Sequence, residues 1–194
     1  MIKIFIAVIL SSIVFAVCCT SSNTTGNSDD IPEKLQRKAD EFVISKTGKD
    51  FFNLYIKPDY DKILKIKDGY YMVYNFSIPG KQGVEGEIRF SLDSLGNVQK
   101  NKEVAGIPEC FTGSGCDFKI SKDDALAIAK QSGLEDGVKD WEVKFLWDNE
   151  YKNYTWQIRT ILSETKETGR RSGKVMFIDP VNGNVLDTKE WRVN

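Results

Sequence analysis

The sequence predicts an α+β fold made of two tandem repeats, in each of which one helix packs on an antiparallel β-sheet. Three observations lead to this prediction. Each half of the 194-residue chain opens with a segment of helical apolar spacing and continues with segments in which apolar and polar residues alternate. Turn signals separate the alternating segments, as antiparallel strands require. Residues 86–99 read GEIRFSLDSLGNVQ and residues 173–186 read GKVMFIDPVNGNVL, so one stretch occurs nearly twice.

The repeated stretch indicates an internal duplication with an offset of 87 residues. Its ungapped alignment contains five identities, where about one is expected from average composition. Glycine and asparagine both tolerate positive φ, so the alternative is that two hairpins acquired the same turn residues independently. The shared order of elements before the stretch favours duplication. The identical pairs are Gly86/Gly173, Phe90/Phe177, Gly96/Gly183, Asn97/Asn184 and Val98/Val185.

The N-terminus has the pattern of an export signal. The first three residues, MIK, form a short basic start, and residues 4–17 are apolar apart from two serines. About 14 apolar residues are too few for a membrane-spanning helix and are typical of a signal peptide. We therefore expect residues 1–18 to be a signal peptide. Residues 19–30, which are mostly small and polar, are expected to form a flexible tether.

The end of this signal, FAVCC at residues 15–19, resembles a bacterial lipobox. Either Cys18 or Cys19 is then the lipidated cysteine that becomes the new N-terminus. The alternative is ordinary cleavage after Ala16. A diacylated cysteine holds a domain at a membrane surface without spanning the membrane. We expect an exported protein of the cell envelope, anchored by lipid to a membrane.

The first predicted repeat covers residues 31–105. A capping box at Asp30 and Glu33 is expected to start a helix that ends at Gly48. Alternating residues then predict strands at 52–56, 60–67, 70–78 and 87–92, and a short strand from Val98. Turn signals stand at Asp68-Gly69 and at residues 93–97.

The second predicted repeat covers residues 120–194. Ser121 and Asp124 form a second capping box, and the helix that follows is expected to end before Gly133. Strands are predicted at 141–147, 154–162 and 175–178, with a last strand that ends at Trp191. Residues 164–172 between them are expected to form a polar hairpin tip.

Residues 106–119 are predicted to link the repeats and to hold a disulfide between Cys110 and Cys116. A close cysteine pair in an exported protein favours a disulfide over a metal site. Closing a loop of about 7 residues restricts the unfolded chain by roughly 2–2.5 kcal/mol. The alternative is a thiol redox site, which usually has closer spacing.

Residues 120–190 resemble a PepSY domain. The helix opening ISKDDALAIAK (120–130), the aromatic alternating strands and the ending FIDPVNGNV (177–185) carry the resemblance, and residues 31–105 are PepSY-like. The resemblance implies a small α+β unit with a helix across an antiparallel sheet. PepSY domains occur in propeptides of secreted metallopeptidases and in envelope proteins, where peptidase inhibition or regulation has been proposed. The family has no catalytic motif, so no catalytic residue is carried over.

Composition argues against several kinds of chemistry. The chain contains no histidine, which excludes Ser-His-Asp and Cys-His nucleophiles and histidine-containing zinc sites. Lysine and arginine number 27 against 28 acidic residues, and this balance gives no reason to expect nucleic acid. Asp123 and Asp124 are read as helix-capping residues, and residues 179–184 lack the ligand set of an EF-hand loop. We expect no cofactor and no metal.

We therefore expect a non-enzymatic protein that binds a protein partner, for which a peptidase is one candidate. Exposed aromatic residues dominate binding energy at protein interfaces, and arginines at a hairpin tip suit an acidic partner. The alternative is a small-ligand or glycan-binding module with aromatic residues in a cleft between the repeats, and a carboxylate-based hydrolase is a third class. The residues predicted for the binding surface are Tyr70, Tyr74, Trp156, Arg170 and Arg171.

Overall fold

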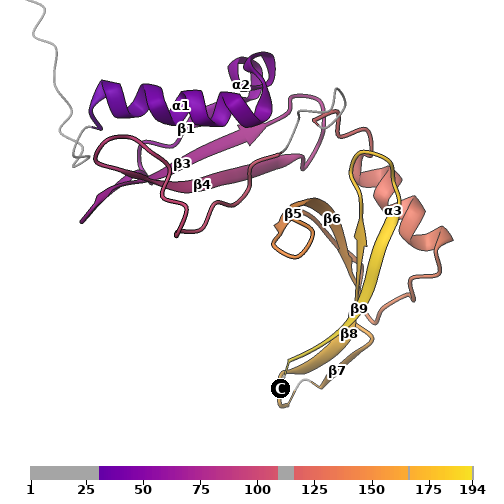
Figure 1. Ribbon diagram of the computed structural model, residues 1–194. Coiled ribbons are helices and arrows are strands. Elements are labelled where there is room, and N and C mark those ends of the chain that lie inside the picture. The colour runs from indigo at the N-terminus through magenta and orange to yellow at the C-terminus, as the bar shows by residue number, and fades with distance from the viewer. Residues whose placement is uncertain (1–30, 109–115, 166, 194) are drawn as a thin grey trace, which may run out of the picture.

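The computed structural model describes residues 31–108, 116–165 and 167–193. Within these ranges the chain forms three helices and two antiparallel sheets, so the predicted mixture of helix and antiparallel sheet is confirmed (Figure 1). The predicted signal peptide, the tether, and Cys18, Cys19 and Cys110 lie outside the described residues. No helix in the described ranges is long and apolar enough to span a bilayer.

The first half opens with two helices, α1 (Glu33–Thr47) and α2 (Lys49–Tyr55). Asp30 of the predicted capping box lies outside the described residues. The N-cap residue of α1 is Pro32, and no described side chain caps it, so the role predicted for Glu33 is wrong. Three apolar residues of α1 are buried, in agreement with its helical apolar spacing, and Gly48, with φ of 81°, ends the helix as predicted. Those residues are Leu35, Ala39 and Val43.

The strand predicted at residues 52–56 is wrong over most of its length, since α2 occupies residues 49–55. Phe51 and Tyr55 stand four positions apart on this helix, with ring centroids 5.1 Å from each other. Phe51 also contacts Phe76, and Phe52 contacts Tyr74, both in the adjacent sheet. The aromatic side chains therefore reach the core from a helical turn as well as they would from a strand. Tertiary packing decides between the two.

The first sheet contains β1 (Ile56–Pro58), β2 (Leu64–Ile66), β3 (Gly69–Ser77) and β4 (Glu85–Asp93). β3 is central, because β4 pairs along its whole length while β1 and β2 pair with different parts of it. The predicted strand from Val98 is reduced to a single bridge between Leu92 and Val98. The sheet therefore follows the predicted order of elements but ends one strand early.

The second half contains α3 (Lys122–Gln131) and five strands: β5 (Glu142–Asp148), β6 (Asn153–Arg159), β7 (Ser163–Thr165), β8 (Arg170–Ile178) and β9 (Val185–Val193). β8 is central, with β6 and β7 pairing to different parts of it and β9 beside it. The predicted polar tip at residues 164–172 is partly strand, since β7 and β8 pair across it.

The capping box of α3 forms as predicted. The Ser121 hydroxyl accepts from the Asp124 backbone N–H at 3.1 Å, and the Asp124 carboxylate accepts from the Ser121 N–H at 3.0 Å. Each hydrogen bond satisfies a backbone donor that a helix start would otherwise leave without a partner. These hydrogen bonds, that of the Ser121 side chain first, hold the pKa of Asp124 below its ordinary value.

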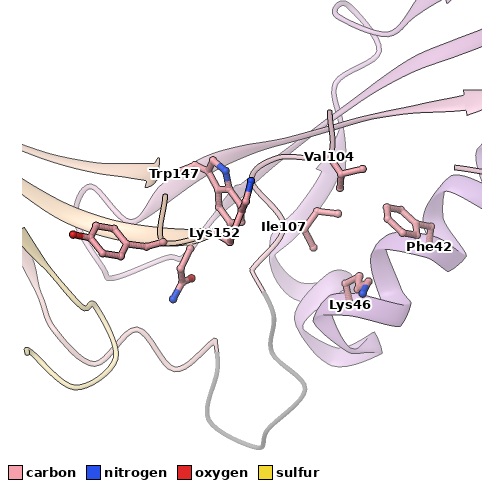
Figure 2. A pocket seen from close by; sticks show the side chains of 8 residues that line it. Phe42, Lys46, Val104, Ile107, Trp147 and Lys152 are labelled. Carbon is pink, nitrogen blue, oxygen red and sulfur yellow. The ribbon is translucent and has the colours of Figure 1, made fainter. Parts of the chain in front are cut away.

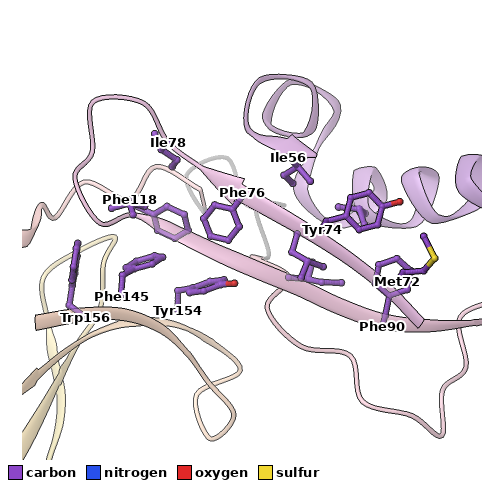
Figure 3. Close-up of a cluster of buried hydrophobic side chains, with 14 of the residues drawn as sticks. Ile56, Met72, Tyr74, Phe76, Ile78, Phe90, Phe118, Phe145, Tyr154 and Trp156 are labelled. Carbon is purple, nitrogen blue, oxygen red and sulfur yellow. The ribbon is translucent and has the colours of Figure 1, made fainter. Parts of the chain in front are cut away.

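The two halves share one hydrophobic core (Figure 3). Ala125 and Ala129 of α3 are buried in the core that contains the second sheet, and α1 and α2 cover the first sheet. Beyond the helices, a row of aromatic rings continues from one sheet to the other. Ring centroids are 5.1 Å apart for Phe76–Tyr154 and 5.2 Å apart for Phe118–Phe145 and Phe145–Trp156. The row consists of Phe76, Phe118, Phe145, Tyr154 and Trp156.

Polar contacts and a glycine fix this junction. The Tyr154 hydroxyl of the second half donates to the backbone carbonyl of Gly106 at 3.1 Å, and Lys81 of the first half donates to the Phe118 carbonyl at 2.7 Å. A Cβ atom added to Gly86 would overlap the Tyr154 hydroxyl and come within 2.6 Å of the Phe76 ring. Glycine at position 86 therefore gives Tyr154 the space to pack onto the first sheet.

One polar network lies between α1 and the first sheet. The buried Tyr74 hydroxyl donates to the Asp40 carboxylate at 2.7 Å, and the Gln36 amide donates to both groups, at 2.8 Å to Asp40 and 2.9 Å to Tyr74. Burial, and then the hydrogen bond to Asp40, raises the pKa of Tyr74 far above its ordinary value. Tyr74 therefore stays neutral and serves as a buried link between helix and sheet.

The first prediction tests the shared core through Phe118→Ala. This change should lower the free energy of unfolding by about 3–5 kcal/mol, because a fully buried ring is removed from between the halves. All four tryptophans, at positions 141, 147, 156 and 191, belong to the second half, so tryptophan emission reports on that half and on its junction with the first half. Far-UV circular dichroism reports on both halves. We expect the two urea transitions to coincide in the unaltered chain and to separate in Phe118→Ala.

Leu92→Ala is the matched control, because Leu92 is fully buried on the first sheet under α1 and away from the aromatic row. It should also destabilise the chain, by about 2–5 kcal/mol, but leave the two transitions coincident. Coincident transitions in Phe118→Ala would show that the aromatic row does not couple the halves.

The second prediction concerns the start of α3. Ser121→Ala should lower the free energy of unfolding by about 1 kcal/mol at neutral pH. A carboxyl whose pKa is lowered by folding stabilises the fold above its unfolded-state pKa and loses that contribution as the pH falls through the folded-state value. The stability difference should therefore shrink as the pH falls below 3.8, the ordinary value for Asp124. Urea titrations over this range measure it.

Ser132→Ala, at the other end of the same helix, is the control and should show little effect at any pH. A Ser121→Ala difference that stays constant into the acid range would contradict the coupling between Ser121 and Asp124.

Candidate functional site

Three of the five residues predicted for a binding surface are buried. Tyr74 and Trp156 are 0% and 1% exposed, and Tyr70 is 8% exposed. In the strand register Tyr70 lies beside Leu92 and Tyr74 beside Ile88, so both face the core side of the first sheet. The Trp156 indole N–H donates to the Ile120 carbonyl at 2.9 Å, inside the junction. The prediction that these three side chains form an exposed surface is therefore wrong, and they are core residues.

The other two predicted residues, Arg170 and Arg171, are exposed at the start of β8. Arg171 lies beside Glu164 of β7 and beside Val193 of β9 in the register, which places it at the far end of the second sheet. Arg192 is one position away on β9 and is also exposed. Among the described residues, neither Arg170 nor Arg171 forms an ion pair with a carboxylate. This end of the sheet therefore presents positive charge to solvent.

Acidic residues with a displaced pKa hold local structure and are poor candidates for catalysis. Asp59 accepts a 2.8 Å hydrogen bond from Asn75, which is the main cause that lowers its pKa. Lys62 bonds Glu87 at 2.6 Å, and this contact raises the pKa of Lys62. The Asp93 carboxylate accepts hydrogen bonds from Asn97, and these lower its pKa, as the bond from Asn75 does for Asp59. A glycosidase acid needs a raised pKa near a second carboxylate, whereas the pKa values of the Asp59 and Asp93 carboxyl groups are lowered.

The cysteine pair is only partly visible. Cys116 is half-buried and disulfide-bonded. Cys110 lies outside the described residues, so the pairing of Cys110 with Cys116 stays a prediction. In the described ranges no cluster of three or more acidic, histidine or cysteine side chains is placed to hold a metal ion.

A cavity of about 490 Å³ lies between the two halves, and we call it the junction cleft (Figure 2). Phe42 and Lys46 of α1 form one wall, and the β5–β6 turn forms the opposite wall. Between them lie two apolar side chains of the segment that follows the first sheet. Among the residues that the structure describes, the lining consists of Phe42, Lys46, Val104, Ile107, Trp147, Tyr151, Lys152 and Asn153.

Each wall is held by packing outside the cleft. Phe42 contacts Phe90 of the first sheet, with 4.8 Å between ring centroids. Trp147 contacts Tyr154 at 5.4 Å, and its indole N–H donates to the Asn149 side chain at 3.0 Å. The apolar walls therefore belong to side chains that the core fixes in place, as is usual for preformed binding pockets.

Aromatic and aliphatic side chains form most of the cleft lining, and the charged groups of the described lining are cations. Its lining, as far as the structure describes the chain, contains Lys46 and Lys152 and no acidic residue. Neither ammonium group pairs with a carboxylate in the part of the chain that the structure describes. Lys152 has φ of 50°, and it is the only residue other than glycine with positive φ in the described ranges. Asparagine, aspartate and glycine adopt this left-handed backbone conformation more readily than lysine does, so a lysine at this turn position is unusual.

Sequence reasoning missed the cleft residues. Helical apolar spacing indicates only that Phe42 lies on the apolar face of the first helix, and alternation indicates only that Trp147 lies on one face of the strand predicted at 141–147. Each wall comes from a different half, and no local pattern predicts that the β5–β6 turn meets α1. The one available signal is a turn, residues 148–153, that is flanked by Trp147 and Tyr154 and contains Tyr151.

Comparison with protein families finds a match to the second half of the chain. Residues 119–189 match the family model described as PepSY: Peptidase propeptide and YPEB domain. This part of the chain is a PepSY domain. It begins just before α3 and includes β5 to β8 and most of β9. The resemblance predicted from the helix opening and the hairpin ending is therefore confirmed for the second half. The match does not include residues 31–105.

No curated protein and no solved structure matched this chain.

Proposed function

We propose that this chain is a non-enzymatic, exported protein whose PepSY domain binds a protein partner, and that a secreted peptidase is the first partner to test. The observation that carries the proposal is the PepSY match over residues 119–189, whose description names peptidase propeptides. A propeptide acts on its peptidase through a binding surface, and needs no catalytic side chain of its own. The absence of histidine from the whole sequence agrees with this role.

Arg170 and Arg171 are the residues we assign to the partner surface of the PepSY domain. They are exposed, and they stand at the end of a sheet that is anchored in the core by Met176 and Ile178 of the same strand. Arginine forms paired hydrogen bonds with carboxylates and is enriched at protein interfaces. An acidic surface on the partner is the complement of this arginine pair.

We propose that the two halves arose by duplication. The turns after β4 and β8 are built alike, since the backbone N–H of Asp93 donates to Asn97 and that of Asp179 donates to Asn184. The second turn is one residue longer, which explains why the ungapped alignment sets Asp179 against Leu92. The turn glycines also correspond. A Cβ on Gly96 would lie 3.1 Å from Leu35 of α1, and one on Gly183 would lie 3.0 Å from Ile128 of α3.

We also propose that the chain is lipid-anchored through Cys18 or Cys19 and resides in the cell envelope. The apolar N-terminal segment and the polar run before the first helix support this proposal. An anchored protein binds a secreted or membrane-bound partner at the surface where that partner is released.

A second candidate function is small-ligand or glycan binding. The junction cleft favours it, since three aromatic residues line a cavity between the halves as this alternative requires. A neutral sugar would leave the charges of Lys46 and Lys152 without partners. A hydrolase is not supported, because the displaced carboxyl pKa values described above are lowered.

The third prediction tests partner binding. The purified chain, immobilised as bait in envelope extract, should retain a protein at micromolar concentration, and the same chain should slow a secreted peptidase in an inhibition assay. The double change Arg170→Glu with Arg171→Glu should weaken capture by about tenfold or more, because it reverses two exposed charges. The double change Lys34→Glu with Arg37→Glu, at two exposed positions of α1, is the charge-matched control and should leave capture unchanged. Failure to retain any partner, together with no peptidase inhibited, would contradict the proposal.

The fourth prediction tests the anchor. Cells that express the chain in the presence of a radioactive fatty acid should incorporate label into it, and the label should be lost in one of the two variants Cys18→Ser and Cys19→Ser. The variant that abolishes labelling identifies the modified cysteine. An unlabelled chain with a new N-terminus after Ala16 would instead show ordinary cleavage.

A further inference from the structure

We propose that the junction cleft binds an acidic peptide segment of the protein partner, with a large apolar side chain of that segment inserted between Phe42 and Trp147. The inference rests on the proposed function, because it names the feature of the partner that the chain recognises. It concerns a site formed by both halves, apart from the arginine pair at the far end of the PepSY domain.

The walls of the cleft select an apolar group. Phe42 and Trp147 stand on opposite sides, with Val104 and Ile107 between them (Figure 2). Both aromatic rings are held from behind by other rings, Phe90 and Tyr154 respectively, so the cleft does not close by their movement. An apolar side chain placed here removes its own surface and that of the walls from water, which is favourable by roughly 25 cal/mol per Å².

The charges of the cleft select an anion. Of the described residues, Lys46 and Lys152 belong to the lining, whereas no aspartate or glutamate does. Among the described residues, two other lysines near the junction already form ion pairs with carboxylates. Lys81 pairs with Asp117, and Lys189 pairs with Glu150. The two lysines of the cleft thus retain their capacity to pair with a ligand, and an ion pair next to apolar walls is less screened than one in open water.

The arrangement of the two lysines favours a peptide over a small carboxylate. Lys46 comes from α1 and Lys152 from the β5–β6 turn, so the two cations lie on opposite walls, with Val104 and Ile107 between these walls (Figure 2). A peptide with the pattern acidic, apolar, acidic presents two carboxylates on either side of one apolar side chain. A small carboxylate has a single anionic group and satisfies only one of the lysines.

The test uses the purified mature chain and three fluorescein-labelled peptide amides, Gly-Glu-Phe-Glu-Gly, Gly-Gln-Phe-Gln-Gly and Gly-Glu-Ala-Glu-Gly. Fluorescence anisotropy measures their binding. The first peptide should bind at least about tenfold more tightly than either of the others. The second peptide lacks the carboxylates, and the third lacks the large apolar side chain. Its affinity should also fall as the salt concentration rises. Equal affinities for the first two peptides, or no binding of the first at millimolar concentration, would overturn the inference.

Variants of the chain locate the site. Lys46→Gln and Lys152→Asn should each weaken binding of the first peptide several-fold, and the double variant should weaken it about tenfold or more. Asparagine is chosen at position 152 because it tolerates the positive φ of this turn, so the variant should fold normally. Lys34→Gln, on α1 but outside the cleft, is the matched control and should bind like the unaltered chain. Unchanged binding in the double variant would overturn the inference.

Two further measurements separate the alternatives. Peptide binding should change the tryptophan emission of the chain, and most of that change should be absent in Trp147→Phe. Free 3-phenylpropionate should compete only weakly, and competition equal to that of the peptide would show a small-carboxylate site and overturn the commitment to a peptide. If the double lysine variant still captures the protein partner at full strength, the cleft inference fails while the proposed function stands.

Discussion

The packing of Phe118 and Tyr154 between the two sheets is the interaction on which the rest of the structure depends. Neither helix layer covers the whole apolar face of its own sheet. The facing ends of the two sheets carry Phe76 on one side and Phe145 and Trp156 on the other, and Phe118 and Tyr154 pack between them. The junction is therefore part of one continuous core. Aromatic pairs at about 5 Å add geometric specificity to this burial, which fixes how the halves meet.

The junction also determines where the chain can bind something else. Tyr154 can pack onto the first sheet because position 86 has no side chain, and this contact brings the β5–β6 turn beside α1. The turn reaches beyond the packed rings, so Trp147 and Phe42 approach each other without meeting, and the junction cleft remains between them. The same contact that joins the halves thus creates the cavity that Lys46 and Lys152 line.

Local signals in the sequence predicted most strands and the second helix, because alternation, capping residues and Gly-containing turns act within a few positions. The Ser121 capping box and the β3–β4 pairing are examples. The same signals failed at α2, where the period-two spacing of Phe52, Leu54 and Ile56 was overridden by ring contacts with the first sheet. Alternation also could not tell which face of a strand is covered, and so Tyr74, which lies under α1, and Trp156, which lies at the junction, were assigned to the surface. The cleft depends on contacts between distant segments, which no local pattern encodes.

A shared interior restricts how this protein can be taken apart or recombined. The segment between residues 105 and 120 looks like a natural place to separate two modules, yet Ile107 and Phe118 within it are buried against both of them. Either fragment alone would present a band of aromatic rings to water, a surface typical of proteins that self-associate. The PepSY domain of this chain is thus not an independent folding unit, because the first half of the chain covers its aromatic side chains.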